Sequence, residues 1–185
     1  MQDDGELDKE VARKIQSGWA KWRAASGVLC DRRIPMKLKG KFYSTVVRPV
    51  MMYGSECWAT KKTHEQKLHV AEMRMLRLMC GVTRKDRMEN VYVRENLGVE
   101  SIGDVLAQNR LRWYGHVMRK PEEDVVKKVW KEGQGDKLKR GRPEQTWDAV
   151  IRRDMKDRGL DESMVWDKED WRLSIRVPTL VKLGK

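Results

Sequence analysis

The amino-acid sequence predicts a mainly α-helical protein, in which a small helical bundle is followed by further short helices and a basic loop. Along most of the 185 residues, apolar side chains recur every three or four positions, the spacing that lines one face of a helix. Alternation of apolar and polar residues, which is typical of strands, does not extend over a useful length. Eight Trp and eleven Met also supply bulky side chains for a core.

Two helices are predicted in the first third of the chain. The first spans residues 8–25, where apolar residues at helical spacing are Val11, Ile15, Trp19 and Trp22. The second follows Pro35 and closes at Gly54, with a bend at Pro49, which has no backbone N–H to donate. The side chains that this second helix would direct inward are Leu38, Phe42, Val46 and Met52.

The clearest helix covers residues 63–80, where Thr63 and Gln66 have the spacing of a capping box and Gly81 follows the last turn. Its apolar stripe consists of Leu68, Ala71, Met75, Leu76 and Met79. Shorter helices are expected over residues 87–96, 101–120, 144–158 and 163–176, with an exposed basic loop at 133–143. We expect a thumb-like helical region over residues 1–85 and a helical tail over residues 86–185.

The net charge of +12 and a pI near 9.7 indicate a polyanionic partner, most simply nucleic acid. Between Arg32 and Lys62, eight basic residues accompany a single acid, Glu56, whereas the first ten residues are acidic. A merely solubilising surface would not be segregated in this way. Near the C-terminus, interleaved acids and bases over residues 152–172 indicate solvated ion pairs on helices rather than a metal-dependent nuclease site.

The cysteines and histidines indicate no metal site, and no cofactor is expected. Cys30, Cys57 and Cys80 are odd in number and widely spaced, which argues against a disulfide framework, and the three histidines add no zinc-ligand pair. No apolar run is long enough to span a membrane, and no signal-peptide core follows Met1. We therefore expect no membrane partner and a reducing environment, nuclear or cytoplasmic.

Five sequence blocks, in order, carry a resemblance to a known family. They are residues 18–33 (GWAKWRAASGVLCDRR), 48–58 (RPVMMYGSECW), 71–86 (AEMRMLRLMCGVTRKD), 109–119 (NRLRWYGHVMR) and 140–147 (RGRPEQTW). The chain resembles the region that follows the palm in reverse transcriptases of non-LTR, LINE-type retrotransposons, especially the RTE-like branch. This resemblance implies a thumb, a helical bundle that grips the template–primer duplex, and a C-terminal tail. The aromatic-x-Asp-Asp turn that would hold polymerase magnesium ions does not occur, so no catalytic residue is assigned and the chain alone is not expected to be an enzyme.

Three basic segments supply the candidate nucleic-acid contacts. A thumb needs cations that meet phosphates, which position a duplex without reading its sequence. In the thumb-like region the candidates are Arg32, Arg33, Lys37, Lys39, Lys41 and Arg48.

The second segment, residues 110–116, mixes cations with aromatic side chains, as nucleic-acid modules do. Its candidates are Arg110, Arg112 and Tyr114, although core packing by Trp113 with solvated arginines also explains the pattern. The third segment contains Arg-Gly-Arg-Pro, the core of an AT-hook, with Lys139, Arg140 and Arg142 as candidates. An equally good account is that this segment fixes the entry to the helix containing Trp147.

These observations lead to two functional hypotheses. The first is a non-catalytic nucleic-acid-binding fragment of a LINE-type RNA-directed DNA polymerase, which grips an RNA/DNA template–primer duplex through backbone phosphates. The alternative is a domesticated, retrotransposon-derived protein that acts as a protein-interaction or regulatory module, with a protein partner on exposed helix faces.

Overall fold

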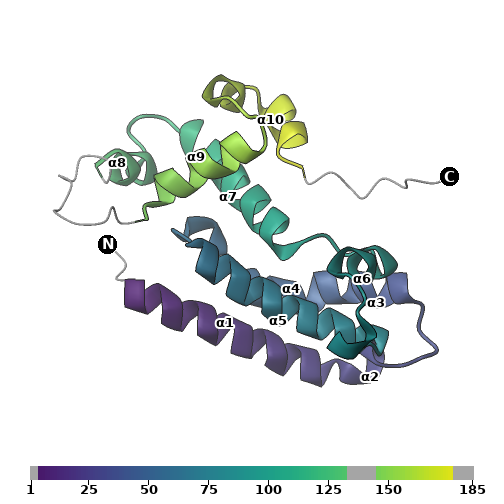
Figure 1. Ribbon diagram of the computed structural model, residues 1–185. Helices are drawn as coiled ribbons and strands as arrows, with labels where there is room; N and C mark the ends of the chain where they lie inside the picture. The colour runs from purple at the N-terminus through teal and green to yellow at the C-terminus, as the bar shows by residue number, and fades with distance from the viewer. Residues whose placement is uncertain (1–3, 133–144, 177–185) are drawn as a thin grey trace. The chain divides into compact units, whose positions relative to one another are not determined.

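A computed structural model describes residues 4–132 and 145–176, and all of the regular secondary structure in these two ranges is helical (Figure 1). The prediction of a mainly α fold is confirmed. The described chain forms two compact units, and the predicted basic loop at 133–143 lies outside it. Unit 1 comprises residues 4–54 and 60–106, and unit 2 comprises residues 55–59, 107–132 and 145–176.

Unit 1 is a bundle in which the long helices α1 and α5 run side by side (Figure 1). The last helix of the series, α7, begins here and continues into unit 2. In chain order the helical elements are α1 (Asp4–Ala24), α2 (Ser26–Leu29), α3 (Met36–Phe42), the π-helix η1 (Tyr43–Val47), α4 (Arg48–Met52), α5 (Lys62–Cys80), the 3₁₀ turn η3 (Arg84–Asp86), α6 (Asn90–Leu97) and α7 (Ile102–Met118).

Helix α5 supplies much of the core of unit 1, as its sequence predicts. All five stripe residues, from Leu68 to Met79, are buried, and Gly81 ends the helix with a φ of +67°. The start differs by two positions from the predicted capping box. The backbone N–H of Lys61 donates to Nδ1 of His64, so the helix is capped by His64 rather than by Thr63.

The predicted second helix is present and Met52 is buried as predicted, but Phe42 and Val46 are only partly buried. Leu38 is 56% exposed, whereas the buried side chains at four-residue intervals are Lys39, Tyr43, Val47 and Met51. The helix is also divided by the π-turn η1, which directly precedes the segment with Pro49. Because Pro49 lacks an N–H and its ring crowds the carbonyl of Thr45, the regular α-helical ladder cannot continue through this point.

A buried carboxylate joins α3–α4, α5 and the start of α7 within unit 1. Arg48 donates from Nε and Nη2 to Oε1 of Glu72, at 3.1 and 2.8 Å, and Tyr43 donates to the same oxygen. The other oxygen of Glu72 accepts from the backbone N–H of Ile102 at 3.1 Å. Glu72 itself is completely buried.

This connection corrects the boundary predicted at residue 85. Val93, Leu97, Val99 and Ile102 are all fully buried, so residues 86–106 belong to the same compact unit as α1–α5. The boundary lies within α7, after Leu106. The glycine at 98, with a φ of +66°, ends α6 as the sequence predicts.

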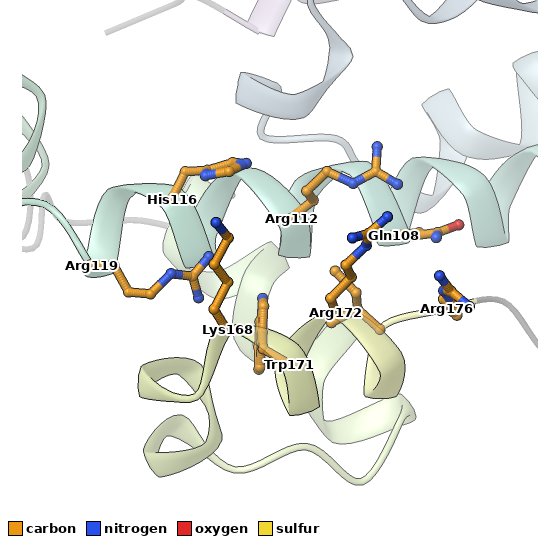
Figure 2. Close-up of a pocket in the computed structure, with 9 residues that line it drawn as sticks. Gln108, Arg112, His116, Arg119, Lys168, Trp171, Arg172 and Arg176 are labelled. Carbon is orange, nitrogen blue, oxygen red and sulfur yellow. The ribbon is translucent and has the colours of Figure 1, made fainter.

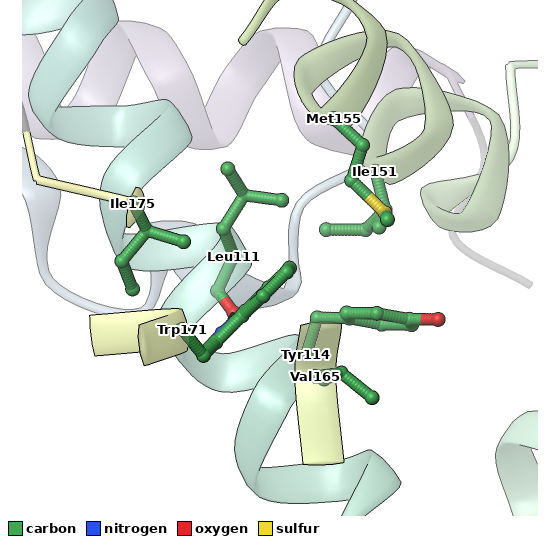
Figure 3. Close-up of a cluster of buried hydrophobic side chains, with 7 residues drawn as sticks. All are labelled: Leu111, Tyr114, Ile151, Met155, Val165, Trp171 and Ile175. Atoms are coloured by element: carbon green, nitrogen blue, oxygen red, sulfur yellow. Dashed lines mark hydrogen bonds between the residues drawn. The ribbon is translucent and has the colours of Figure 1, made fainter. Parts of the chain in front are cut away.

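Unit 2 is built around the second part of α7. Its other elements are η2 (Ser55–Cys57), α8 (Val125–Glu132), α9 (Trp147–Asp157), η4 (Glu162–Trp166) and α10 (Lys168–Ser174). The core cluster in Figure 3 consists of Leu111, Tyr114, Ile151, Met155, Val165, Trp171 and Ile175. The indole N–H of Trp147 donates to the carbonyl of Glu56 at 2.8 Å, which ties residues 55–59 to α9.

Candidate nucleic-acid interface

A cationic pocket lies between α7 and α10 in unit 2 (Figure 2). Its volume is about 390 Å³. The residues that line it are Gln108, Arg112, His116, Arg119, Lys168, Trp171, Arg172, Ile175 and Arg176. We call this group the α7–α10 pocket.

Helical spacing brings the charges of this pocket together. Arg112 and His116 are four residues apart on α7 and share a face, and Arg119 follows three residues later, directly after the helix ends. On the opposite wall, Lys168 and Arg172 are four residues apart on α10, and Arg176 follows after four more. Lys168 points toward α7 in Figure 2.

A glycine permits the close approach of the two walls. A Cβ atom at Gly115 would lie 2.5 Å from Nε1 of Trp171, so a larger residue cannot occupy this position without displacing the indole ring. Trp171 is 1% exposed, and its Nε1–H donates to the carbonyl oxygen of Leu111 at 3.1 Å. Packing and this hydrogen bond together fix α10 against α7 (Figure 3).

Backbone carbonyls hold one arginine of the lining, Arg119, and a second arginine that is not part of it, Arg158. Arg119 donates from Nη1 to the carbonyl of Val165 at 2.6 Å, which anchors its side chain at one end. Arg158, which directly follows α9, donates to the carbonyl of Ile175 at 2.6 Å and positions the end of α10. Packed and hydrogen-bonded groups therefore support the part of the protein from which the lining residues project.

The pocket lining carries five permanently charged groups, four arginines and one lysine, and contains no carboxylate. The nearest acids along α10 are Glu169 and Asp170, which are exposed, and Asp167. Asp167 caps α10, because its carboxylate accepts from the backbone N–H groups of Glu169 and Asp170, both at 2.9 Å. A cavity with this charge is suited to an anion, and arginine is suited to phosphate oxygens in particular.

Only one of the three residues predicted in segment 110–116 lines this pocket. Arg112 does, and it is exposed. Arg110 is 1% exposed and is paired with Asp154 of α9, whose Oδ2 lies 2.7 Å from both Nε and Nη2 of the guanidinium. The prediction of Arg110 as a phosphate contact is therefore corrected: a guanidinium buried in the interior requires a carboxylate partner of its own.

Tyr114 is likewise a core residue. It is 3% exposed and lies against three tryptophans, Trp130, Trp147 and Trp171, with ring centroids 6.2–6.3 Å away. Burial raises the pKa of its phenol to about 12, and the charges of Glu162 and Asp148 act in the same direction. Its ring faces are engaged in the aromatic cluster, so the prediction of a base-stacking contact is corrected.

The candidate contacts of unit 1 divide into buried and exposed residues. Lys39 and Arg48 are 2% and 5% exposed, and their charges are turned inward, Lys39 toward the carbonyl of Met79 and Arg48 to Glu72. Lys39 belongs to the buried stripe and Arg48 is paired with the buried Glu72, which corrects the prediction that these two lie on an outer edge. The exposed candidates are Arg32, Arg33, Lys37 and Lys41.

Two of the exposed candidates already have local partners. Arg33 forms an ion pair with Asp31 at 2.8 Å, and this arginine holds the pKa of the Asp31 carboxyl below its usual value. Lys37 donates to the backbone carbonyl of Glu95. Arg32 and Lys41 are the exposed cations of this group with the clearest access to solvent-borne anions.

The third predicted segment lies outside the described residues. Lys139, Arg140 and Arg142, and with them the AT-hook and helix-entry alternatives, stay predictions. The helix expected from residue 144 begins at Trp147, where the hydroxyl of Thr146 accepts from the backbone N–H of Ala149 at 3.2 Å.

Within the described ranges, no group of three or more His, Cys, Asp or Glu is arranged to hold a metal ion, and no helix has the length and apolarity to cross a membrane.

The sequence interpretation missed most of the α7–α10 pocket. His116 and Arg119 extend the stripe that begins at Arg112, and the spacing of Lys168 and Arg172 is visible in the sequence. The acids between these bases indicated solvated ion pairs instead. In the structure Lys168 and Arg172 line the pocket, whereas Glu169 and Asp170 do not.

Comparison with known proteins gives one informative similarity. An uncharacterized transposon-derived protein of Caenorhabditis elegans is 24% identical over 183 residues, and the match covers 92% of this chain. The chain spans 65% of that relative's length. No family model matches the sequence, and no solved structure is similar to it. The similarity suggests a transposon-derived origin for this sequence.

Proposed function

We propose that this chain is a non-catalytic, nucleic-acid-binding part of a transposon-derived protein and that it contacts strand phosphates through the α7–α10 pocket. One observation carries the proposal: five permanently charged side chains, from α7, α10 and the residues that follow these helices, line one cavity whose lining contains no carboxylate. Cations held in such a cavity attract phosphates by Coulomb interaction and by charge-assisted hydrogen bonds. The net charge of +12 gives the whole chain the same preference.

The resemblance to LINE-type reverse transcriptases supports a more specific role. The blocks at residues 48–58 and 109–119 resemble the region behind the palm, where a thumb and tail hold the template and primer. In this role the chain grips an RNA/DNA backbone for a polymerase whose catalytic aspartates lie elsewhere. Arg32 and Lys41, exposed on unit 1, provide additional phosphate contacts.

A paired substitution tests the proposal. Arg112→Gln with Arg172→Gln removes one cation from each wall of the pocket, and we expect affinity for oligonucleotides of any sequence to fall at least about tenfold. The matched control is Lys21→Gln with Arg23→Gln, which removes the same charge from an exposed part of α1. Fluorescence anisotropy measures binding, and thermal unfolding verifies that both variants are folded.

The two variants separate a site from a general charge effect. The proposal requires a clearly larger loss for the pocket variant than for the α1 variant. An equal loss in both shows that overall charge alone attracts the nucleic acid, and unchanged binding in the pocket variant removes the α7–α10 pocket from the interface.

The protein-interaction alternative has one observation in its favour. Helix α8 exposes Val125 and Val129, 73% and 62% exposed and four residues apart, and Trp166 is 60% exposed. Lys127, which is on the same helix, has its Nζ 5.8 Å from the ring centroid of Trp166. If this surface defines the function, the wild-type chain binds oligonucleotides no better than the pocket variant does.

A further inference from the structure

The α7–α10 pocket has more positive charge than one internal phosphate in a strand requires. Four arginines and a lysine surround a single cavity, and His116 adds a further nitrogen donor or acceptor. We propose that this pocket holds the terminal phosphate monoester of a nucleic-acid strand, an inference that rests on the function proposed above and names its ligand.

The size of the cavity favours a strand end over the side of a double helix. Its volume of about 390 Å³ is at the lower end of the range for small-molecule sites, roughly 300–1,000 Å³, and fits a group of nucleotide size. A duplex, whose major groove alone is about 12 Å wide, does not enter such a space. A phosphate at the end of a strand can enter the pocket, because only one covalent bond joins it to the rest of the nucleic acid.

The charge of the ligand matches the charge of the walls. A phosphodiester within a strand has one negative charge and two free oxygens, whereas a phosphate monoester has about −1.5 to −2 at pH 7 and three strong acceptor oxygens. With Arg112 on one wall and Lys168 and Arg172 on the other, donors approach from two sides (Figure 2). The third free oxygen of a monoester accepts hydrogen bonds from pocket donors that an internal diester would leave unpaired.

The walls are also fixed in a way that suits a specific anion. Arg119 is anchored by its bond to the carbonyl of Val165, and α10 is held on α7 by the buried indole of Trp171. Pre-positioned donors lose less side-chain freedom on binding than unsupported surface lysines and arginines do.

The test compares strands that differ only in their ends. Single-stranded DNA oligonucleotides of one sequence, with a 5′-phosphate, a 3′-phosphate or two hydroxyl ends, compete for the protein against a labelled strand. We expect a phosphorylated strand to compete about tenfold better than the hydroxyl strand. The Arg112→Gln, Arg172→Gln variant should lose this preference, and the Lys21→Gln, Arg23→Gln control should keep it.

Other outcomes would overturn this inference, and they differ from the outcome that would also overturn the proposed function. Equal competition by all three strands, each weakened by the pocket variant, leaves a nucleic-acid site with no preference for an end. Competition by a 5′-mononucleotide or inorganic phosphate as strong as that of the phosphorylated strand assigns the pocket to a free phosphate compound. Failure of every strand to bind at low salt defeats both this inference and the proposed function.

Discussion

Glu72 shows how a single residue organises unit 1. Its carboxylate is completely buried and accepts hydrogen bonds from Arg48, Tyr43 and the backbone of Ile102. Arg94 adds a second guanidinium, 3.7 Å from Oε2. These partners come from four helical elements, so one side chain satisfies polar groups that would otherwise be buried without a partner.

Removing the charge of Glu72 should therefore destabilise the protein strongly. In the Glu72→Gln variant, Arg48 stays buried without its counter-charge, and breaking a buried pair in this way costs about 3–5 kcal/mol. Urea unfolding followed by tryptophan fluorescence measures the loss. Glu10→Gln, which removes a surface ion pair with Arg13, is the control and should change the unfolding free energy little. Similar stability of the two variants would show that the buried network is not needed for folding.

The sequence did not show which cations are buried in ion pairs, because the acidic partners lie far from them along the chain. Arg48 pairs with Glu72, 24 positions away, and Arg110 pairs with Asp154, 44 positions away. Neither of these acidic partners can be inferred from residue type or from local spacing. Arg112 was named only because residues 110–116 mix cations with aromatic side chains, a pattern that also named the buried Arg110 and Tyr114.

At the scale of elements, α7 depends on a glycine where it meets α10. The absence of a side chain at Gly115 leaves room for the indole of Trp171, which a Cβ atom would approach to 2.5 Å. The same helix contains Gly103, where an added Cβ would meet only the Ser101 hydroxyl, at 3.7 Å. The two glycines share a helix but differ in what surrounds them.

Substituting alanine at each position should have opposite effects. Gly115→Ala forces Trp171 away from α7 and should lower the unfolding free energy by about 1–3 kcal/mol. Gly103→Ala gains helix propensity and should be neutral or stabilising by up to about 1 kcal/mol. Thermal unfolding of both variants measures the difference. Equal melting temperatures would indicate that α10 does not pack on α7 as closely as the structure shows.

The helices themselves were largely predictable, and the failures have local causes. The stripe of α5 stands out because five large apolar residues fall on one face, and Gly81 and Gly98 mark helix ends by adopting positive φ angles. In the second helix the buried stripe includes Lys39 in place of Leu38, and lysine is a residue type that is rarely buried.

At the scale of the whole molecule, the α7–α10 pocket gathers positive charge from two separate parts of the chain. Its two walls come from segments about 55 residues apart in the chain. The sequence alone gives the basic character and the helices but not this pairing of helix faces, which arises from the packing of Trp171 on Leu111 and Gly115. The fold class was therefore predictable, whereas most of the candidate site was not.

The salt dependence of binding tests the central claim most directly. Each phosphate neutralised by the protein releases condensed cations, so log K falls with log salt by about 0.7 per phosphate for a single strand. We predict a steep slope for the wild-type chain, a slope flatter by about one unit for the Arg112→Gln, Arg172→Gln variant, and a wild-type slope for Lys21→Gln, Arg23→Gln. Identical slopes for the wild type and the pocket variant would contradict the assignment of the α7–α10 pocket as the phosphate-binding site.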